Sequence, residues 1–294
     1  MPLLLPLLPL IAQVGPFATT PGAGRSTPVE QGVVRPKRRP TWVAEGAAPE
    51  AASAKSGRGK ECVAQVDNDA DDAVELAQGW LANGAASAGE RAEANLCLGL
   101  AQARLGEWGE AETAFLAARD AAGTDRLMRA RLGAMAGNAA LAAGADDRAL
   151  AALDGAKADV AGLSDPALAT TVALDRARAL VGLKRLDEAG TALAEARTAS
   201  PDNAEAWLLS ATLSRRQGNL AAAQEQIVRA AELMPVDPAI GLEAGVIAVL
   251  AGHEEAARKS WQSVIAAAPD SPEAETAKGY LAQLGPVPAK EAGR

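Results

Sequence analysis

The stretch that decides the fold is residues 204–237, which read AEAWLLSATLSRRQGNLAAAQEQIVRAAELMPVD. Two alanine-rich segments, of a composition that favours helix, flank a turn at Gly218. Ala223 follows five residues after the turn, and the large apolar Ile227 comes four residues later. Pro235 then ends the second segment, because proline lacks an N–H and clashes with the preceding helical turn. The stretch therefore predicts two helices joined by a short turn.

The same pattern recurs along the chain. Five segments share a turn residue, an alanine five residues later, a large apolar residue four further on and a small residue after three more. The alanines are spaced by 38, 40, 34 and 34 residues, and four of the five turn residues are glycine, with Lys184 as the exception. Such self-similarity indicates stacked structural repeats. The shared positions are the alanines Ala111, Ala149, Ala189, Ala223 and Ala257, the large residues Phe115, Leu153, Leu193, Ile227 and Trp261, and the prolines Pro201, Pro235 and Pro269.

This 34-residue pattern resembles the tetratricopeptide-repeat (TPR) family, whose unit is a helix–turn–helix. The resemblance implies an all-α fold, namely a right-handed α-solenoid of stacked repeats with a C-terminal capping helix. Small residues on both helices of a unit allow an approach to about 8 Å, so stacking buries one continuous core. The expected order is a degenerate helical unit at 61–91, repeats at 92–129, 130–169, 170–203, 204–237 and 238–271, a capping helix at 272–285 and a disordered tail at 286–294.

The first sixty residues differ in composition from the rest. Leu3–Ile11 is an apolar run too short to span a bilayer, so residues 1–12 are interpreted as a signal peptide; the alternatives are an apolar N-terminus or a misplaced start codon. Residues 13–60 are rich in Pro, Gly and Ser and are expected to be disordered. Residues 1–60 carry eight Lys/Arg and three Asp/Glu. Their basic run 35–40 is either a solvated linker or a weak contact for an anionic surface.

Composition excludes several classes of protein. Alanine accounts for 73 of the 294 residues and aromatic residues for 3%, which disfavours β structure. Two cysteines and one histidine cannot form a four-ligand zinc site, and no haem, iron–sulfur or other cofactor is expected. The net charge of −8 argues against nucleic acid as a partner. No nucleophile–base pair is evident, so we expect no enzymatic activity.

The two cysteines, Cys62 and Cys97, leave two interpretations open. An even cysteine count in an exported chain is typical of a disulfide. Alternatively, both are small buried hydrophobic residues, since free cysteine is often buried.

The resemblance also predicts a partner-binding groove lined by the first helix of each repeat. Lys and Asn do not occur where chaperone-binding relatives hold a terminal carboxylate, so a chaperone C-terminus is not expected as the ligand. Of two adjacent arginines, Arg215 and Arg216, only one can face the groove because helical neighbours point about 100° apart, and Arg215 is favoured. The predicted groove residues are Arg131, Asn138, Arg178, Leu208, Thr212 and Arg215, and the expected ligand is a short acidic and apolar peptide segment.

These observations predict a non-catalytic protein-interaction module in the periplasm or outside the cell, or else in the cytoplasm if the signal peptide is absent. The alternative is a structural factor of envelope assembly that associates with itself. The sequence does not set the oligomeric state.

Overall fold

The structure, a computed structural model, describes residues 57–83, 85 and 87–285. The expected signal peptide at 1–12, nearly all of the segment 13–60 and the tail 286–294 lie outside the described residues. Within them the chain forms thirteen helices and no strand. The helices are α2 (Gly57–Asn68), α3 (Ala70–Asn83), α4 (Ala88–Leu105), α5 (Trp108–Ala121), α6 (Arg126–Ala142), α7 (Asp146–Val160), α8 (Pro166–Gly182), α9 (Leu186–Ala199), α10 (Ala204–Arg216), α11 (Leu220–Leu233), α12 (Pro238–Leu250), α13 (Glu254–Ala267) and α14 (Pro272–Leu284).

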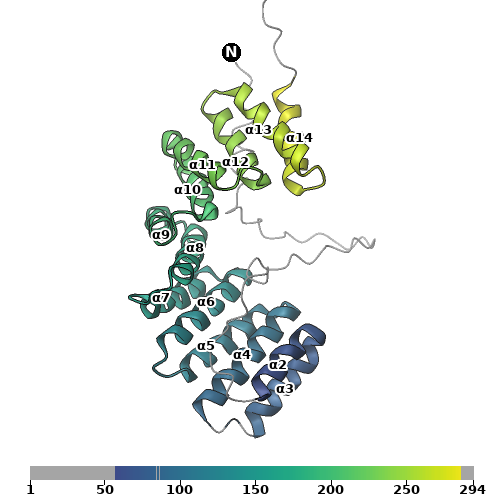
Figure 1. The fold of residues 1–294 in the computed structure, drawn as a ribbon, viewed down its shortest axis with the longest axis vertical. Helices are drawn as coiled ribbons and strands as arrows, with labels where there is room; N and C mark the ends of the chain where they lie inside the picture. Colours follow the sequence, from purple (N-terminus) through teal and green to yellow (C-terminus); the bar gives the residue numbers. More distant parts are fainter. Residues whose placement is uncertain (1–56, 84, 86, 286–294) are drawn as a thin grey trace, which may run out of the picture.

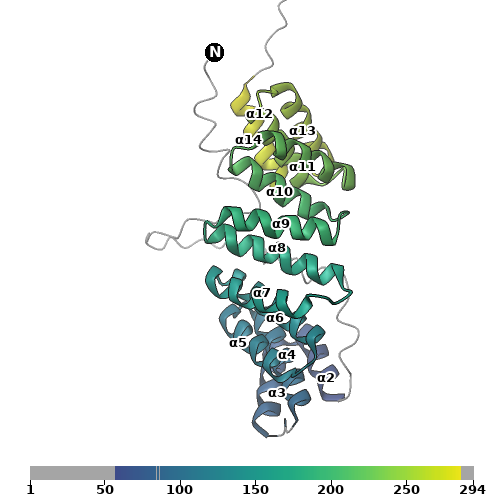
Figure 2. The same cartoon turned by 90° about the vertical axis from the view of Figure 1, so that its left-hand side faces the viewer.

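Each helix packs against the next one along the chain, and the stack follows an elongated arc (Figures 1 and 2). Five helix pairs, from α4/α5 to α12/α13, contain the shared alanine positions. The prediction of an all-α solenoid is confirmed. None of the described helices is both long and apolar enough to cross a bilayer.

The turns within the pairs have one backbone geometry. Gly106, Gly144, Gly218 and Gly252 all have positive φ, which glycine adopts without a steric cost. Lys184 adopts φ 61° at the corresponding turn and is the non-glycine member of the set. An N-cap residue precedes the first helix of each pair and also precedes α14. Its side chain accepts a hydrogen bond from the backbone N–H of the residue three positions later. These N-cap residues are Ser87, Asp125, Asp165, Asn203, Asp237 and Ser271.

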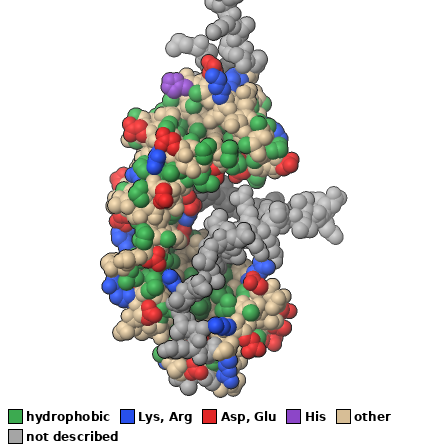
Figure 3. Space-filling view, in the orientation of Figure 1, with side chains coloured by type: hydrophobic (Ala, Val, Ile, Leu, Met, Phe, Trp, Pro, Cys, Tyr) green, Lys and Arg blue, Asp and Glu red, His purple; other side chains and the backbone are tan. Residues whose placement is uncertain are grey.

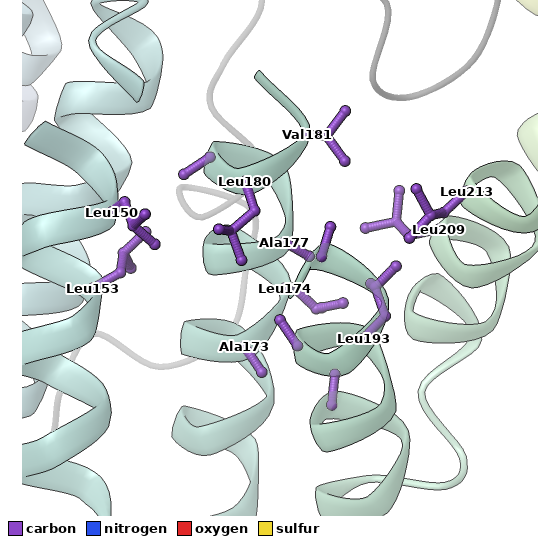
Figure 4. Close-up of a cluster of buried hydrophobic side chains, with 14 of the residues drawn as sticks. Leu150, Leu153, Ala173, Leu174, Ala177, Leu180, Val181, Leu193, Leu209 and Leu213 are labelled. Atoms are coloured by element: carbon purple, nitrogen blue, oxygen red, sulfur yellow. The ribbon is translucent and has the colours of Figure 1, made fainter. Parts of the chain in front are cut away.

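Close helix crossings explain the alternation of small and large residues. A Cβ atom at Gly99 would lie 2.6 Å from the ring of Phe115, and Gly137 and Gly245 meet Leu153 and Trp261 even more closely. Between the crossings, leucines from successive helices form a shared core (Figure 4). The repeated alanines Ala111, Ala149, Ala189, Ala223 and Ala257 are all fully buried.

The C-terminal end of the solenoid is closed by α14. Tyr280 packs on Trp261 with ring centroids 5.1 Å apart. Arg258 donates hydrogen bonds to the Gly285 and Leu284 carbonyl oxygens at 2.7 and 3.1 Å. Apolar surface on the last pair is therefore covered by a helix that is polar on its outer side.

The N-terminal end differs in two details from the sequence-based boundaries. Helix α2 begins at Gly57, although residues 57–60 had been assigned to the disordered segment. Its first turn packs on α4, where a Cβ at Gly59 would meet Glu93, so two glycines that indicated a linker belong to a helix instead. Helix α4 begins at Ala88, ahead of the expected boundary at 92, because Ser87 and Glu90 form a capping box.

A disulfide joins Cys62 of α2 to Cys97 of α4, with the Cα atoms 6.0 Å apart. Both residues are buried, together with Val66 and Ala73. The bond therefore fixes α2 to the first helix of the first full pair.

Candidate functional site

The first helices of the pairs form one continuous side of the solenoid. Helix α6 contacts α8, and α10 contacts α12, in addition to the contacts of each helix with its own partner. In Figure 1, α6 and α8 lie on the inner side of the arc, and α7 and α9 lie on its outer side. We call the side formed by α4, α6, α8, α10 and α12 the inner face. Figure 3 shows that charged and apolar side chains are interspersed around this arc.

Polar side chains link α6, α8 and α10 across the inner face. Asn138 Nδ2 donates to Asp175 Oδ2 at 3.5 Å. Arg178 donates to Asp175 on its own helix and to Glu205 on the next first helix. Asp175 is only 3% exposed, and this burial raises the pKa of its carboxyl, although Arg178 and Asn138 oppose the shift.

A second set of contacts links α10 to α12. Arg215 Nε donates to Glu243 Oε1 at 2.6 Å, and both side chains are almost completely buried. The Thr212 hydroxyl donates to the Leu208 carbonyl oxygen on its own helix, at 3.1 Å. Burial raises the pKa of Glu243, against the opposing effect of Arg215. The ion pair is therefore internal to the protein.

Together the six linked residues form what we call the inner ladder. Each contact between helices joins side chains at least 27 residues apart in sequence, so the ladder connects successive repeats and not residues within one helix. A buried ion pair adds little net stability compared with apolar packing, but loss of one partner leaves a charge unpaired. The inner ladder consists of Asn138, Asp175, Arg178, Glu205, Arg215 and Glu243.

The structure corrects the predicted exposure of three groove residues. Leu208 is 8% exposed and belongs to the core with Ile227, and Thr212 is completely buried. Arg215 is 4% exposed and binds Glu243, so its guanidinium does not face a partner. The adjacent Arg216 is the exposed member of the pair and forms no ion pair within the described residues. Helix α12 packs on the side of α10 that carries Arg215, so the prediction that the Arg215 guanidinium is open to a partner is wrong.

The other three predicted groove residues keep part of their side chains accessible. The Arg131 side chain is 29% exposed, and its Nη2 lies 3.7 Å from Asp165 Oδ2. Arg178 is likewise 29% exposed, although it takes part in the inner ladder, and Asn138 is half-buried. Arg131, Arg178 and Arg216 lie on three successive first helices, α6, α8 and α10.

Sequence analysis missed the acidic members of the inner ladder. Glu243 is the single charged residue of α12, and Asp175 lies in a helix otherwise rich in Ala, Leu and Val. An acid in such a helix was the available signal, because a buried carboxylate requires a hydrogen-bonding partner.

The inner face offers guanidinium groups for carboxylates and partly buried leucines for apolar side chains. The leucines are Leu96, Leu100, Leu141 and Leu242. No group of three or more His, Cys, Asp or Glu side chains in the described part of the chain could hold a metal ion. The arrangement is suited to noncovalent recognition of a partner segment.

Comparison with known proteins supports the fold. No protein-family model matches the chain, and no curated protein matches it. A tetratricopeptide repeat protein from Parabacteroides merdae superposes with a TM-score of 0.62 at 16% identity, covering 78% of this chain and 88% of that one. The type IV pilus biogenesis factor PilW gives 0.59 at 16% identity, with 75% and 98% covered. Pseudomonas aeruginosa PilF gives 0.57 at 15% identity, with 76% and 100% covered.

Four observations indicate the same stack of helix pairs: the repeat spacing, the glycine turns, the close helix crossings and these superpositions. The chain therefore has the fold of the tetratricopeptide-repeat proteins, an all-α solenoid of stacked helix pairs.

Proposed function

We propose that the chain is a non-catalytic protein-interaction module that binds an extended or helical segment of a partner protein along the inner face. The observation that carries this proposal is the placement of Arg131, Arg178 and Arg216 on three successive first helices, each with accessible side-chain surface. The rest of the domain is acidic, since residues 61–294 hold 21 Lys/Arg and 34 Asp/Glu. Cations are thus concentrated where a partner would lie.

The chemistry of the inner face indicates the ligand. A guanidinium group can donate two parallel hydrogen bonds to one carboxylate, so acidic side chains spaced along a segment would engage successive helices. Leu141 on α6 and Leu242 on α12 would each contact apolar side chains of the bound segment. We expect weak binding that declines as salt rises, because these cations are partly solvated.

Selection from a random peptide library tests this proposal. The full chain should select peptides that contain both acidic and apolar residues. The double variant Arg131→Glu with Arg216→Glu should lose binding of these peptides, because both cations become anions. Neither residue belongs to the inner ladder, but Arg131→Glu places an anion near Asp165, the N-cap of α8. Circular dichroism should therefore confirm that the variant keeps its helix content.

A matched control reverses two charges on second helices. Arg229 on α11 and Lys259 on α13 are 43% and 74% exposed. Among the described residues, each pairs only with an acid on its own helix. Arg229→Glu with Lys259→Glu changes the net charge by the same amount and should bind the selected peptides like the unmodified chain. Equal loss of binding in both variants would indicate an effect of net charge and would contradict a site on the inner face.

We further propose that the protein acts in an oxidising compartment of a bacterial cell envelope or outside the cell. The Cys62–Cys97 disulfide and the apolar N-terminal run support this location. The similarity in fold to PilW, a pilus biogenesis factor, favours envelope assembly as the second candidate function. Fractionation followed by mass spectrometry of the thiols should find the bonded form outside the cytoplasm; two free thiols in the native compartment would reject the location.

A further inference from the structure

A groove of about 690 Å³ lies between α2 and α3 at the N-terminal end of the solenoid. Buried Cys62 and Trp80 line its floor, at 4% and 7% exposure. Three carboxylate side chains and Leu76 line it at more exposed positions; the acids are Glu61, Asp72 and Glu75. The groove is separate from the inner face, whose first helices begin with α4.

The two ends of the solenoid differ in how their apolar residues are covered. At the C-terminal end, α14 covers the last pair, and Trp261 is completely buried. At the N-terminal end, Leu76 is 51% exposed. A repeat stack requires a polar cover at each end, and Leu76 leaves apolar surface exposed at this one.

The charges in the groove specify the occupant. Glu61 and Glu75 form no ion pair within the described part of the chain, and the side chain of Asp72 accepts one hydrogen bond, from Gln65 at 3.4 Å. Arg58 is the single cation among the lining residues that the structure describes. An occupant with several cations and an aromatic or aliphatic side chain for Leu76 would match this groove.

The chain contains a segment with this composition. Residues 35–43 read RPKRRPTWV, in which four cations are followed by Trp42 and Val43. The described chain begins at Gly57, and the next residue, Arg58, lines the groove. The intervening residues 44–56 can span up to roughly 45 Å, about twice the length of α3. A tether of this length raises the effective concentration of the segment at the groove to about the millimolar range.

We propose that residues 35–43 of the same chain bind in the groove between α2 and α3 and cover the N-terminal end of the solenoid. Arg38 and Arg39 pair with Glu61 and Glu75, and the Trp42 ring packs on Leu76. Pro36 and Pro40 favour extended backbone in the residues that precede them, which suits a segment lying along a groove.

Photo-crosslinking of the full chain tests this inference. Trp42→p-benzoylphenylalanine places a photoreactive group in the segment, and mass spectrometry after irradiation identifies its targets. We expect intramolecular crosslinks to peptides from α2 and α3. Glu61→Lys with Glu75→Lys in the same background should lower their yield about fivefold or more, because two favourable charge contacts become repulsive.

The control variant changes two exposed acids that do not line the groove, Glu110 on α5 and Glu225 on α11. Glu110→Lys with Glu225→Lys alters the net charge equally and should leave the crosslink yield unchanged, with circular dichroism showing equal helix content in all variants. Crosslinks of dimer mass would overturn the proposal in favour of a second copy. Crosslinks on the inner face, or equal yields in the groove and control variants, would also overturn it.

Discussion

At the scale of single residues, burial decides the role of a charge in this protein. Arg215 and Arg216 are adjacent, yet one is 4% exposed and bound to Glu243 while the other faces solvent. Adjacent residues on a helix point about 100° apart, so the packing of α12 on α10 selects which arginine becomes structural. Arginine is thus part of the inner ladder at position 215 and part of the solvated surface at position 216.

Truncation of these two arginines should have very different effects on stability. Arg215→Ala leaves the buried Glu243 carboxylate unpaired and should lower the free energy of unfolding by about 3–5 kcal/mol. Arg216→Ala removes an exposed side chain and should change it by less than about 0.5 kcal/mol. Urea denaturation followed by circular dichroism measures both.

A double variant distinguishes the charge effect from lost packing. Arg215→Met with Glu243→Leu removes both charges and keeps similar volume, so it should recover most of the stability lost in Arg215→Ala. If Arg215→Ala and Arg216→Ala denature at the same urea concentration, the buried pair described here is incorrect.

At the scale of helices, glycine has two opposite roles. In α12, Gly245 lies under the indole of Trp261, and an added Cβ would overlap that ring. In α14, Gly279 is exposed, and an added Cβ would meet nothing within 4 Å. The first glycine is required by a close crossing, whereas the second only makes its helix less stable.

Alanine at these two positions should therefore shift stability in opposite directions. Gly245→Ala should lower the free energy of unfolding by about 1–3 kcal/mol, because overpacking moves Trp261 or the helices apart. Gly279→Ala should raise it by about 0.4–1 kcal/mol, because alanine restricts the unfolded chain and favours helix. Thermal unfolding of the two variants gives the signs, and a stabilising effect of Gly245→Ala would contradict the close crossing.

The helices themselves were predictable from sequence because their signals are local. The turn glycines, the caps such as Ser271 and the alanine–large residue pattern all lie within one helix pair. The inner ladder was not predictable in this way, since Arg215 meets an acid 28 residues away only once two repeats are stacked. Leu208 illustrates the same limit: its helix was predicted, but its place in the core depends on the neighbouring repeat.

At the scale of the whole molecule, stability is distributed along a line of neighbours. Each helix pair contacts the pairs beside it, so a change at one end has little direct effect on the other. The disulfide lies at the N-terminal end and joins residues 35 positions apart. It restricts the unfolded chain and fixes α2 against α4.

Reduction of the Cys62–Cys97 bond should act locally. It should lower stability by about 3–4 kcal/mol in the chain-entropy description, because a closed loop of this length is released. Hydrogen exchange with and without reductant should show faster exchange in α2 and α3 and unchanged exchange in α10 to α13. Faster exchange along the entire solenoid would contradict this locality.

The inner ladder also determines how the molecule responds to force. Its cross-links connect the inner edges of α6, α8, α10 and α12, where neighbouring helices touch. Bending that opens the arc stretches short charged contacts, whereas bending that closes it compresses side chains already packed together. We therefore expect these three contacts to resist changes in the curvature of the arc.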